Sequence, residues 1–138
     1  MKNNKQILVT GGAGFVGTNL IKLLLKKTSY KVVSIDNYTS GTKLNHIRSS
    51  RVKYIKGNTA NISKLVKNPD KIKTIFHFGE FARIYQSFLK IDQCMESNSI
   101  GTNAIFNFCL KHKVKLIYSA TSASLGNKGN DRNLSPYA

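Results

Sequence analysis

Long hydrophobic runs are missing from this 138-residue sequence. No apolar stretch approaches the ~18 residues that a membrane-spanning helix needs. Near the start, only Ile7-Leu8-Val9 separates the first lysines from a glycine cluster, and this run is too short for the apolar part of a secretory signal. We therefore expect no membrane partner and a cytoplasmic location.

Cysteine is also scarce, with Cys94 and Cys109 the two in the chain. Both fall in one helical pattern, where their spacing corresponds to about 22 Å at 1.5 Å per residue. A disulfide needs Cα atoms within about 7 Å, so we expect two buried free thiols in a reducing compartment. No cluster of residues has the spacing of metal ligands, which predicts no metal site.

Acidic residues number six against 22 Lys and Arg, which gives a formal net charge of +16. Such a balance raises the question of nucleic-acid binding. Eighteen of the basic residues are lysines spread along the whole chain, and the two clusters, Lys26-Lys27 and Lys111-His112-Lys113, are not interleaved with aromatic residues. This pattern is typical of a solvated surface, so we expect no nucleic-acid partner.

The most informative motif is a glycine-rich loop between a short apolar run and an apolar helical pattern. Gly11, Gly14 and Gly17 have the spacing of a dinucleotide-binding loop, in which the backbone and the helix N-terminus hold a pyrophosphate. A Walker-type phosphate loop is excluded because Thr18 and Asn19 stand where Lys and Ser or Thr are needed.

An acidic residue follows the next predicted strand. Asp36 comes nineteen residues after Gly17, at about the distance where a carboxylate accepts hydrogen bonds from the adenosine ribose and repels a 2′-phosphate. Alternatively, Asp36 and Asn37 only begin a turn. The glycine loop, the helical pattern and Asp36 follow one another at the expected spacing. Together they favour a dinucleotide site, with NAD rather than NADP as the cofactor.

Strand and helix patterns alternate along the chain, which predicts an α/β fold: a doubly wound parallel sheet of Rossmann type with about five strands. Cofactor contacts are expected where strands end, at 78–79 and 119–120. The predicted strands are 6–10, 31–36, 52–56, 74–78 and 115–119, and the predicted helices are 14–27, 62–68 and 87–111.

Side-chain environments follow from the same patterns. In the last predicted helix, near-helical spacing predicts core contacts for Phe88, Ile91, Met95, Ile105, Phe108 and Cys109. Among the histidines, we expect His77 to pack at a strand end, and His46 and His112 to face solvent.

An ordered set of motifs runs through the whole chain: the glycine loop, Asp36-Asn37, His77-Phe78-Gly79, Asn98 with Gly101-Thr102, Tyr118 to Ser122, and Ser135-Pro136-Tyr137. Together they resemble the extended short-chain dehydrogenase/reductases. Within these, the chain is most similar to the NAD-dependent sugar-nucleotide epimerase/dehydratase group, whose best-known member is UDP-glucose 4-epimerase.

The resemblance implies roles for individual residues. The backbone of the glycine loop would hold the pyrophosphate, Asp36 and Asn37 the adenosine ribose, and Asn58, in place of a usual Asp, the adenine amino group. Residues near the nicotinamide ribose would follow the fourth strand. The full set of implied cofactor-binding residues is Gly11, Gly14, Phe15, Val16, Gly17, Asp36, Asn37, Asn58, Phe78, Gly79 and Asn98.

The same resemblance makes Thr121 and Tyr137 the catalytic residues. Tyrosine has an ordinary pKa near 10, which the charge of NAD⁺ and a lysine four residues further on would lower. Tyr137 would then take a proton from a sugar hydroxyl that Thr121 orients. The alternatives are a loop hydroxyl bonded to nearby backbone for Thr121 and a surface aromatic for Tyr137.

Some positions depart from the family pattern. Tyr137 is followed by Ala138 alone, so the lysine of Tyr-x-x-x-Lys and a substrate-binding domain are not in this sequence. We expect residues 1–138 to be an incomplete NAD-binding domain without activity of its own. Ser122 and Ala123 replace the Asp and Glu typical of dehydratases, Leu125 replaces a common tyrosine, and Glu80 stands where a small residue is usual.

Two functions remain open on these grounds. One is the NAD-binding part of a nucleotide-sugar epimerase or oxidoreductase, which acts by transient hydride transfer from a sugar carbon to NAD. The other is a non-catalytic NAD-binding module, or a fragment that needs a partner chain. Since an open sheet edge and uncovered apolar surface are expected, self-association into a homo-oligomer is a further expectation.

Overall fold

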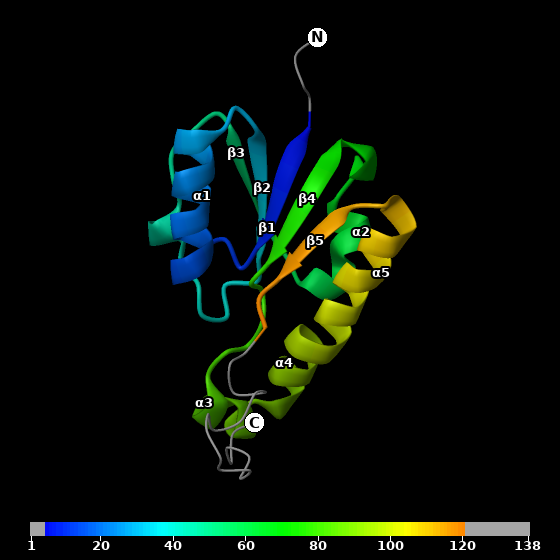
Figure 1. The fold of residues 1–138 in the computed structure, drawn as a ribbon. Helices are drawn as coiled ribbons and strands as arrows, with labels where there is room; N and C mark the ends of the chain where they lie inside the picture. Colours follow the sequence, from blue (N-terminus) through cyan, green and yellow to red (C-terminus); the bar gives the residue numbers. More distant parts are fainter. Residues whose placement is uncertain (1–4, 121–138) are drawn as a thin grey trace, which may run out of the picture.

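A computed structural model describes residues 5–120, which form one five-stranded parallel sheet (Figure 1). The strand order is β3-β2-β1-β4-β5, and neighbouring strands are parallel throughout. The strands are β1 (Gln6–Thr10), β2 (Lys31–Asp36), β3 (Val52–Lys56), β4 (Ile72–His77) and β5 (Lys115–Tyr118).

The chain builds the sheet outward in two directions. It passes from β1 through β2 to β3, then returns to the other side of β1 to form β4 and β5. This reversal creates a switch point between the carboxyl ends of β1 and β4, where ligands bind in doubly wound sheets. The predicted doubly wound α/β fold is confirmed.

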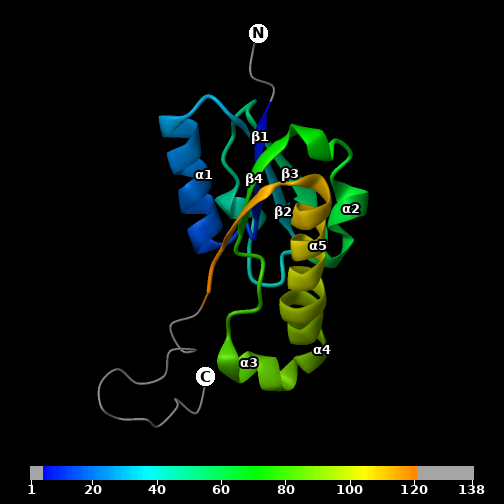
Figure 2. The same ribbon diagram turned by 45° about the vertical axis from the view of Figure 1, so that its right-hand side comes forward.

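Helices cover both faces of the sheet (Figures 1 and 2). Helix α1 (Phe15–Lys27) lies on one face, and α2 (Ile62–Leu65) and α5 (Thr102–His112) lie on the other. Because alternate strand residues point to opposite faces, Ile7 and Val9 of β1 pack with α1, whereas Leu8 packs with α2 and α5.

The helix predicted over 87–111 is broken once, at Lys90, and is continuous from 91 to 112. Four helical elements make up this part of the chain. These are α3 (Ile84–Leu89), α4 (Ile91–Met95), the π-helical η4 (Glu96–Gly101) and α5. Lys90 separates α3 from α4, since its φ of −133° and ψ of 47° lie outside the helical region.

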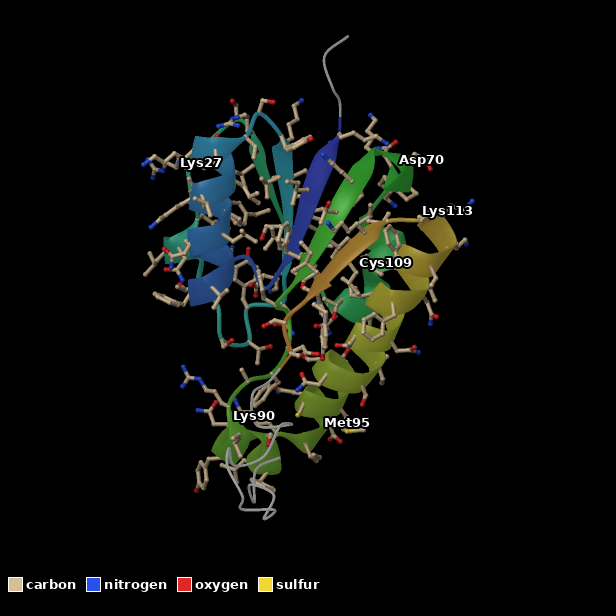
Figure 3. All side chains as sticks on the ribbon, viewed as in Figure 1. Lys27, Asp70, Lys90, Met95, Cys109 and Lys113 are labelled. Atoms are coloured by element: carbon tan, nitrogen blue, oxygen red, sulfur yellow. The ribbon has the colours of Figure 1, made fainter. Side chains whose placement is uncertain are left out.

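Half of the core contacts predicted for this segment are also wrong. Ile105, Phe108 and Cys109 are buried as expected, but Phe88, Ile91 and Met95 are 74%, 55% and 51% exposed. Figure 3 shows Lys90 and Met95 beyond the carboxyl edge of the sheet. Helices α3 and α4 therefore extend past the surface against which the periodic apolar positions were expected to pack.

Other predicted boundaries shift by a few residues. Helix α1 begins at Phe15 because Gly14, predicted as helical, is its extended N-cap residue. Helix α2 ends at Leu65 rather than 68, β4 covers 72–77 rather than 74–78, and β5 ends at Tyr118 rather than 119. The polar connection after β2 contains one short 3₁₀ element, η1 (Lys43–Asn45), and two more follow β3: η2 (Thr59–Asn61) and η3 (Pro69–Lys71).

Several small predictions can be compared with side-chain environments. Both cysteines are free thiols, but Cys94 is only partly buried, so its predicted burial is wrong. His46 and His112 are partly buried rather than facing solvent. The His46 ring stacks on Tyr54 with centroids 3.7 Å apart, and the His112 ring centroid lies 4.6 Å from that of Phe108.

Within residues 5–120, no helix has the length and apolar character that crossing a membrane requires.

Two Ile-to-Ala substitutions test the difference in burial between α4 and α5. Ile105→Ala removes a fully buried side chain of α5, and we expect it to lower the free energy of unfolding by about 2–5 kcal/mol. Ile91→Ala in α4 removes an exposed side chain and should change it by roughly 0.5 kcal/mol or less. Urea denaturation measures both, and equal losses would contradict the exposure of α4.

Candidate functional site

The carboxyl ends of β1, β2 and β4 open into a cleft. Six residues singled out from the sequence line it together, although they come from three separate parts of the chain: Gly11, Gly14, Asp36, Asn37, Phe78 and Gly79. The remaining lining residues are Thr39, Ser40, Gly57, Thr59, Glu80, Phe81 and Ser97.

A larger cavity of about 880 Å³ continues the cleft toward β5. Both share Gly11, Gly14, Phe78 and Glu80 in their linings, so the two form one continuous depression over the switch point. The predicted residues Phe15, Val16, Gly17 and Asn98 line this second part, as do the residues at the end of β5: Tyr118, Ser119 and Ala120.

Two glycines explain how the loop after β1 fits against its surroundings. Gly11 has a φ of +68°, and a Cβ there would lie 2.6 Å from the Phe78 carbonyl oxygen. A Cβ at Gly17 would lie 2.2 Å from the Gly11 carbonyl oxygen. A side chain at either position would force the loop away from β4 or away from α1, which would alter the floor of the cleft.

The N-terminus of α1 faces the cleft through Phe15, Val16 and Gly17. Its N-cap, Gly14, has no side chain to accept a hydrogen bond, and the first turn contains no acidic residue. The first N–H groups of a helix lack intrahelical acceptors and form the positive end of its dipole. This end of the cleft therefore suits an anion such as a pyrophosphate.

Asp36 connects the end of β2 to the glycine loop. Its side chain is 8% exposed, with Oδ2 accepting from the Ala13 backbone N–H at 2.9 Å and Oδ1 from that of Tyr38 at 2.8 Å. A carboxylate has about four acceptor positions, so both oxygens can still accept bonds from ribose hydroxyls. The bond from Tyr38 is the turn contact that the sequence offered as the alternative, whereas the bond from Ala13 was not indicated by the sequence. The geometry also leaves room for the predicted ribose contact.

A chain of amide hydrogen bonds borders the same end of the cleft. Asn58 Nδ2 donates to Glu96 Oε1 at 2.8 Å, and Asn58 Oδ1 accepts from Asn37 Nδ2 at 2.8 Å. Asn37 Oδ1 in turn accepts from the Thr39 backbone N–H at 3.0 Å. The carboxylate at one end and the N–H at the other fix both amide orientations.

This arrangement bears on the role implied for Asn58. Its side-chain oxygen already accepts one bond, and Asn58 is absent from the lining of the cleft although Gly57 and Thr59 are part of it. Contact with an adenine amino group therefore stays a prediction. What the geometry does provide is a fixed orientation for Asn37.

Asn98 holds the loop that follows β4. Its Oδ1 accepts from the Phe81 backbone N–H at 2.6 Å, and its Nδ2 donates to the Phe81 carbonyl oxygen at 3.0 Å. Because both polar atoms of the amide are used, Asn98 positions Phe81, which lines both parts of the cleft. The sequence identified this residue without indicating how it acts.

Thr10, at the end of β1, organises the start of the same loop. Its Oγ1 accepts from the backbone N–H groups of Phe78 and Gly79 at 3.1 and 3.0 Å. Since these donors occupy the hydroxyl lone pairs, the Thr10 hydrogen points to His77 Nδ1, which lies 2.6 Å away and acts as an acceptor.

The other nitrogen of His77 then carries a hydrogen. Nε2 donates to Thr102 Oγ1 at 3.0 Å, and the Thr102 hydroxyl donates to Glu80 Oε1 at 2.8 Å. Tyr118 OH donates to the same Glu80 oxygen at 2.9 Å. A buried hydrogen-bond chain thus runs from the glycine-loop end of β1 through β4 to a carboxylate in the cleft.

Burial decides the charge of His77. The side chain is fully buried, and the loss of solvation lowers the pKa of the imidazole below its ordinary value near 6.5, although Glu80 acts in the opposite direction. The pKa of Tyr118 is raised, first by burial and then by its hydrogen bond to Glu80. A neutral His77 and a protonated Tyr118 are the forms that the hydrogen-bond chain requires.

The sequence did not indicate that Thr10, His77 and Thr102 are joined by hydrogen bonds. The expected packing of His77 at a strand end is confirmed, but its partners are 67 and 25 positions away, so no local pattern could reveal them. Thr39 and Ser40 could have been found, because they directly follow Asp36-Asn37 at a strand end.

The two catalytic candidates, Thr121 and Tyr137, lie outside the described residues. In the part of the chain that the structure covers, no three His, Cys, Asp or Glu side chains are grouped as a metal site would require.

Comparisons with known proteins agree with this geometry. The sequence profile of the NAD dependent epimerase/dehydratase family matches residues 7–138. An ADP-L-glycero-D-manno-heptose-6-epimerase from Brachyspira hyodysenteriae is 32% identical over 129 residues, covering 90% of this chain and 39% of its own. A dTDP-D-glucose 4,6-dehydratase from Dictyostelium discoideum is 30% identical over 141 residues, covering 94% and 32%.

Solved structures give the same result. The Bordetella bronchiseptica enzyme WbmF in complex with NAD⁺ matches with a TM-score of 0.80 at 27% identity, over 97% of this chain and 41% of that one. A UDP-glucose 4-epimerase from Thermotoga maritima with UDP-glucose matches at 0.73 and 25%, over 86% and 38%. The chain thus spans about 40% or less of the length of these relatives.

The hydrogen-bond chain makes a prediction about His77. Long-range ¹⁵N NMR should show a neutral ring with hydrogen on Nε2 at pH 6.5, since burial lowers its pKa. The unfolded chain takes up a proton at His77 first as pH falls, so this residue should reduce the free energy of unfolding below about pH 6.5. A ring protonated on Nδ1 at neutral pH would contradict the assigned direction of the Thr10 bond.

Proposed function

Because the chain belongs to the NAD-dependent epimerase/dehydratase family, we propose that the cleft at the carboxyl ends of β1, β2 and β4 binds NAD. The observation that carries this proposal is the meeting of Asp36 and the glycine loop in one cleft. The family binds NAD, and WbmF was crystallised with it.

Each end of the cleft suits a different part of the cofactor. The adenosine ribose would bind to Asp36, beside the ordered Asn37, and the pyrophosphate would lie at the N-terminus of α1. The nicotinamide half would then extend toward β4 and β5, on the other side of the switch point. The nearly buried carboxylate of Asp36 would repel a 2′-phosphate, so NAD is favoured over NADP.

We further propose that this domain serves the transient oxidation of a nucleotide sugar. NAD, when bound, supplies the acceptor for a hydride from a sugar carbon. Tyr137 would take the proton of the sugar hydroxyl, and Thr121 would orient its oxygen. The support is the family and the relatives that epimerise nucleotide sugars, together with Ser122 and Ala123, which replace the acidic pair typical of dehydratases.

A second candidate is an NAD-binding module that pairs with another chain. Exposed apolar side chains on two neighbouring helices favour it: Phe88 and Leu89 of α3, and Ile91 of α4. Single large apolar residues at a surface are common, whereas a group of them indicates an interaction site.

Calorimetric titration with NAD and NADP tests the cofactor proposal. We expect NAD to bind at least about tenfold more tightly than NADP, a difference of about 1.4 kcal/mol. Asp36→Ala should abolish this preference. Since Asp36 also holds the backbone of Ala13 and Tyr38, the variant should bind both cofactors more weakly, so the ratio of affinities carries the test.

Asp70→Ala is the matched control, because Asp70 lies at the opposite end of the sheet from α3 and α4 (Figure 3). It should leave the preference for NAD unchanged. Equal binding of NAD and NADP by the unaltered chain would overturn the assignment of Asp36, and absence of binding would overturn the cofactor site.

A further inference from the structure

Glu80 places a negative charge where the two parts of the cleft meet. It lines both of them and follows β4 by three residues. The resemblance that identifies most cofactor contacts gives this position to a small residue, so the carboxylate has no role in that pattern.

Two neutral hydroxyls hold the carboxylate in place. Both hydrogen bonds that it accepts from described residues come from neutral hydroxyls, those of Thr102 and Tyr118, and both reach Oε1. The Thr102 hydroxyl is fixed in turn by His77, which is fully buried and neutral. Oε1 is thereby anchored in the lining of the cleft, whose larger part also contains Arg83.

The strand order of the sheet shows on which side of the cleft Glu80 lies. Asp36 ends β2 and marks the adenosine side, and the glycine loop follows β1. Glu80 follows β4, and its donor Tyr118 ends β5. Glu80 therefore lies on the side of the switch point opposite to Asp36, which is the side of the nicotinamide half in the proposed complex.

We propose that Glu80 makes this site discriminate between the two redox forms of the cofactor, favouring NAD⁺ over NADH. This inference rests on the proposed NAD site. The nicotinamide ring carries a positive charge in NAD⁺ and none in NADH, whereas the rest of the two molecules is the same. A nearby carboxylate therefore attracts the oxidised form selectively.

Such a preference suits a reaction in which the hydride is borrowed. In a transient oxidation, the hydride taken from the sugar must return to the keto sugar before the product leaves. A site that binds NAD⁺ more tightly than NADH makes that return more favourable. Glu80 would thus act on the balance between the two redox forms, without taking part in proton transfer.

The test compares affinities for NAD⁺ and NADH by calorimetry on the 138-residue chain. Glu80→Gln removes the charge but keeps an oxygen that can accept from Thr102 and Tyr118. We expect the ratio of the NADH to the NAD⁺ dissociation constant to fall about fivefold, as expected for the loss of one partly screened charge pair. Glu80→Ala, which removes the hydrogen bonds as well, should shift the ratio in the same direction.

Asp70→Asn provides the control, because it removes one negative charge at the other end of the sheet (Figure 3). Its ratio should equal that of the unaltered chain. If Glu80→Gln and Glu80→Ala bind both forms with an unchanged ratio, the role of Glu80 is overturned and the NAD site stands. If the unaltered chain binds neither form, the proposed function itself fails.

Discussion

The close approach of two backbone segments determines the shape of this molecule at its switch point. The loop after β1 and the loop after β4 meet so closely that any side chain at Gly11 would collide with the Phe78 carbonyl. The Thr10 hydroxyl accepts from the Phe78 and Gly79 N–H groups and joins the same two segments. This contact places the glycine loop, the end of β4 and the start of α1 around one cleft.

Charge is distributed unevenly around that cleft. The chain has a formal net charge of +16 and six acidic residues, yet Asp36, Glu80 and Glu96 all lie in or beside the cleft or its bordering amide chain. A basic background attracts an anionic ligand. In the proposed complex, the few carboxylates would select among its parts, because each is held in place by N–H, amide or hydroxyl donors.

The sequence predicted the strands within two residues and the doubly wound topology, because buried parallel strands are continuous apolar runs between turn residues. It did not predict the break at Lys90 or the exposure of Phe88, Ile91 and Met95. Periodicity shows that a helix has an apolar face, but it cannot show where the sheet beneath ends. Glu80 stood out in the sequence only as a departure, since its partners Thr102 and Tyr118 are 22 and 38 positions away.

Backbone amide chemical shifts during an NAD titration test the central claim most directly. The largest shift changes are expected at residues 11–17, 36–40 and 78–81, with little change in residues 69–72, where β4 begins at the other end of the sheet (Figure 3). Changes confined to another surface, or none at saturating NAD, would contradict the assignment of this cleft as the cofactor site.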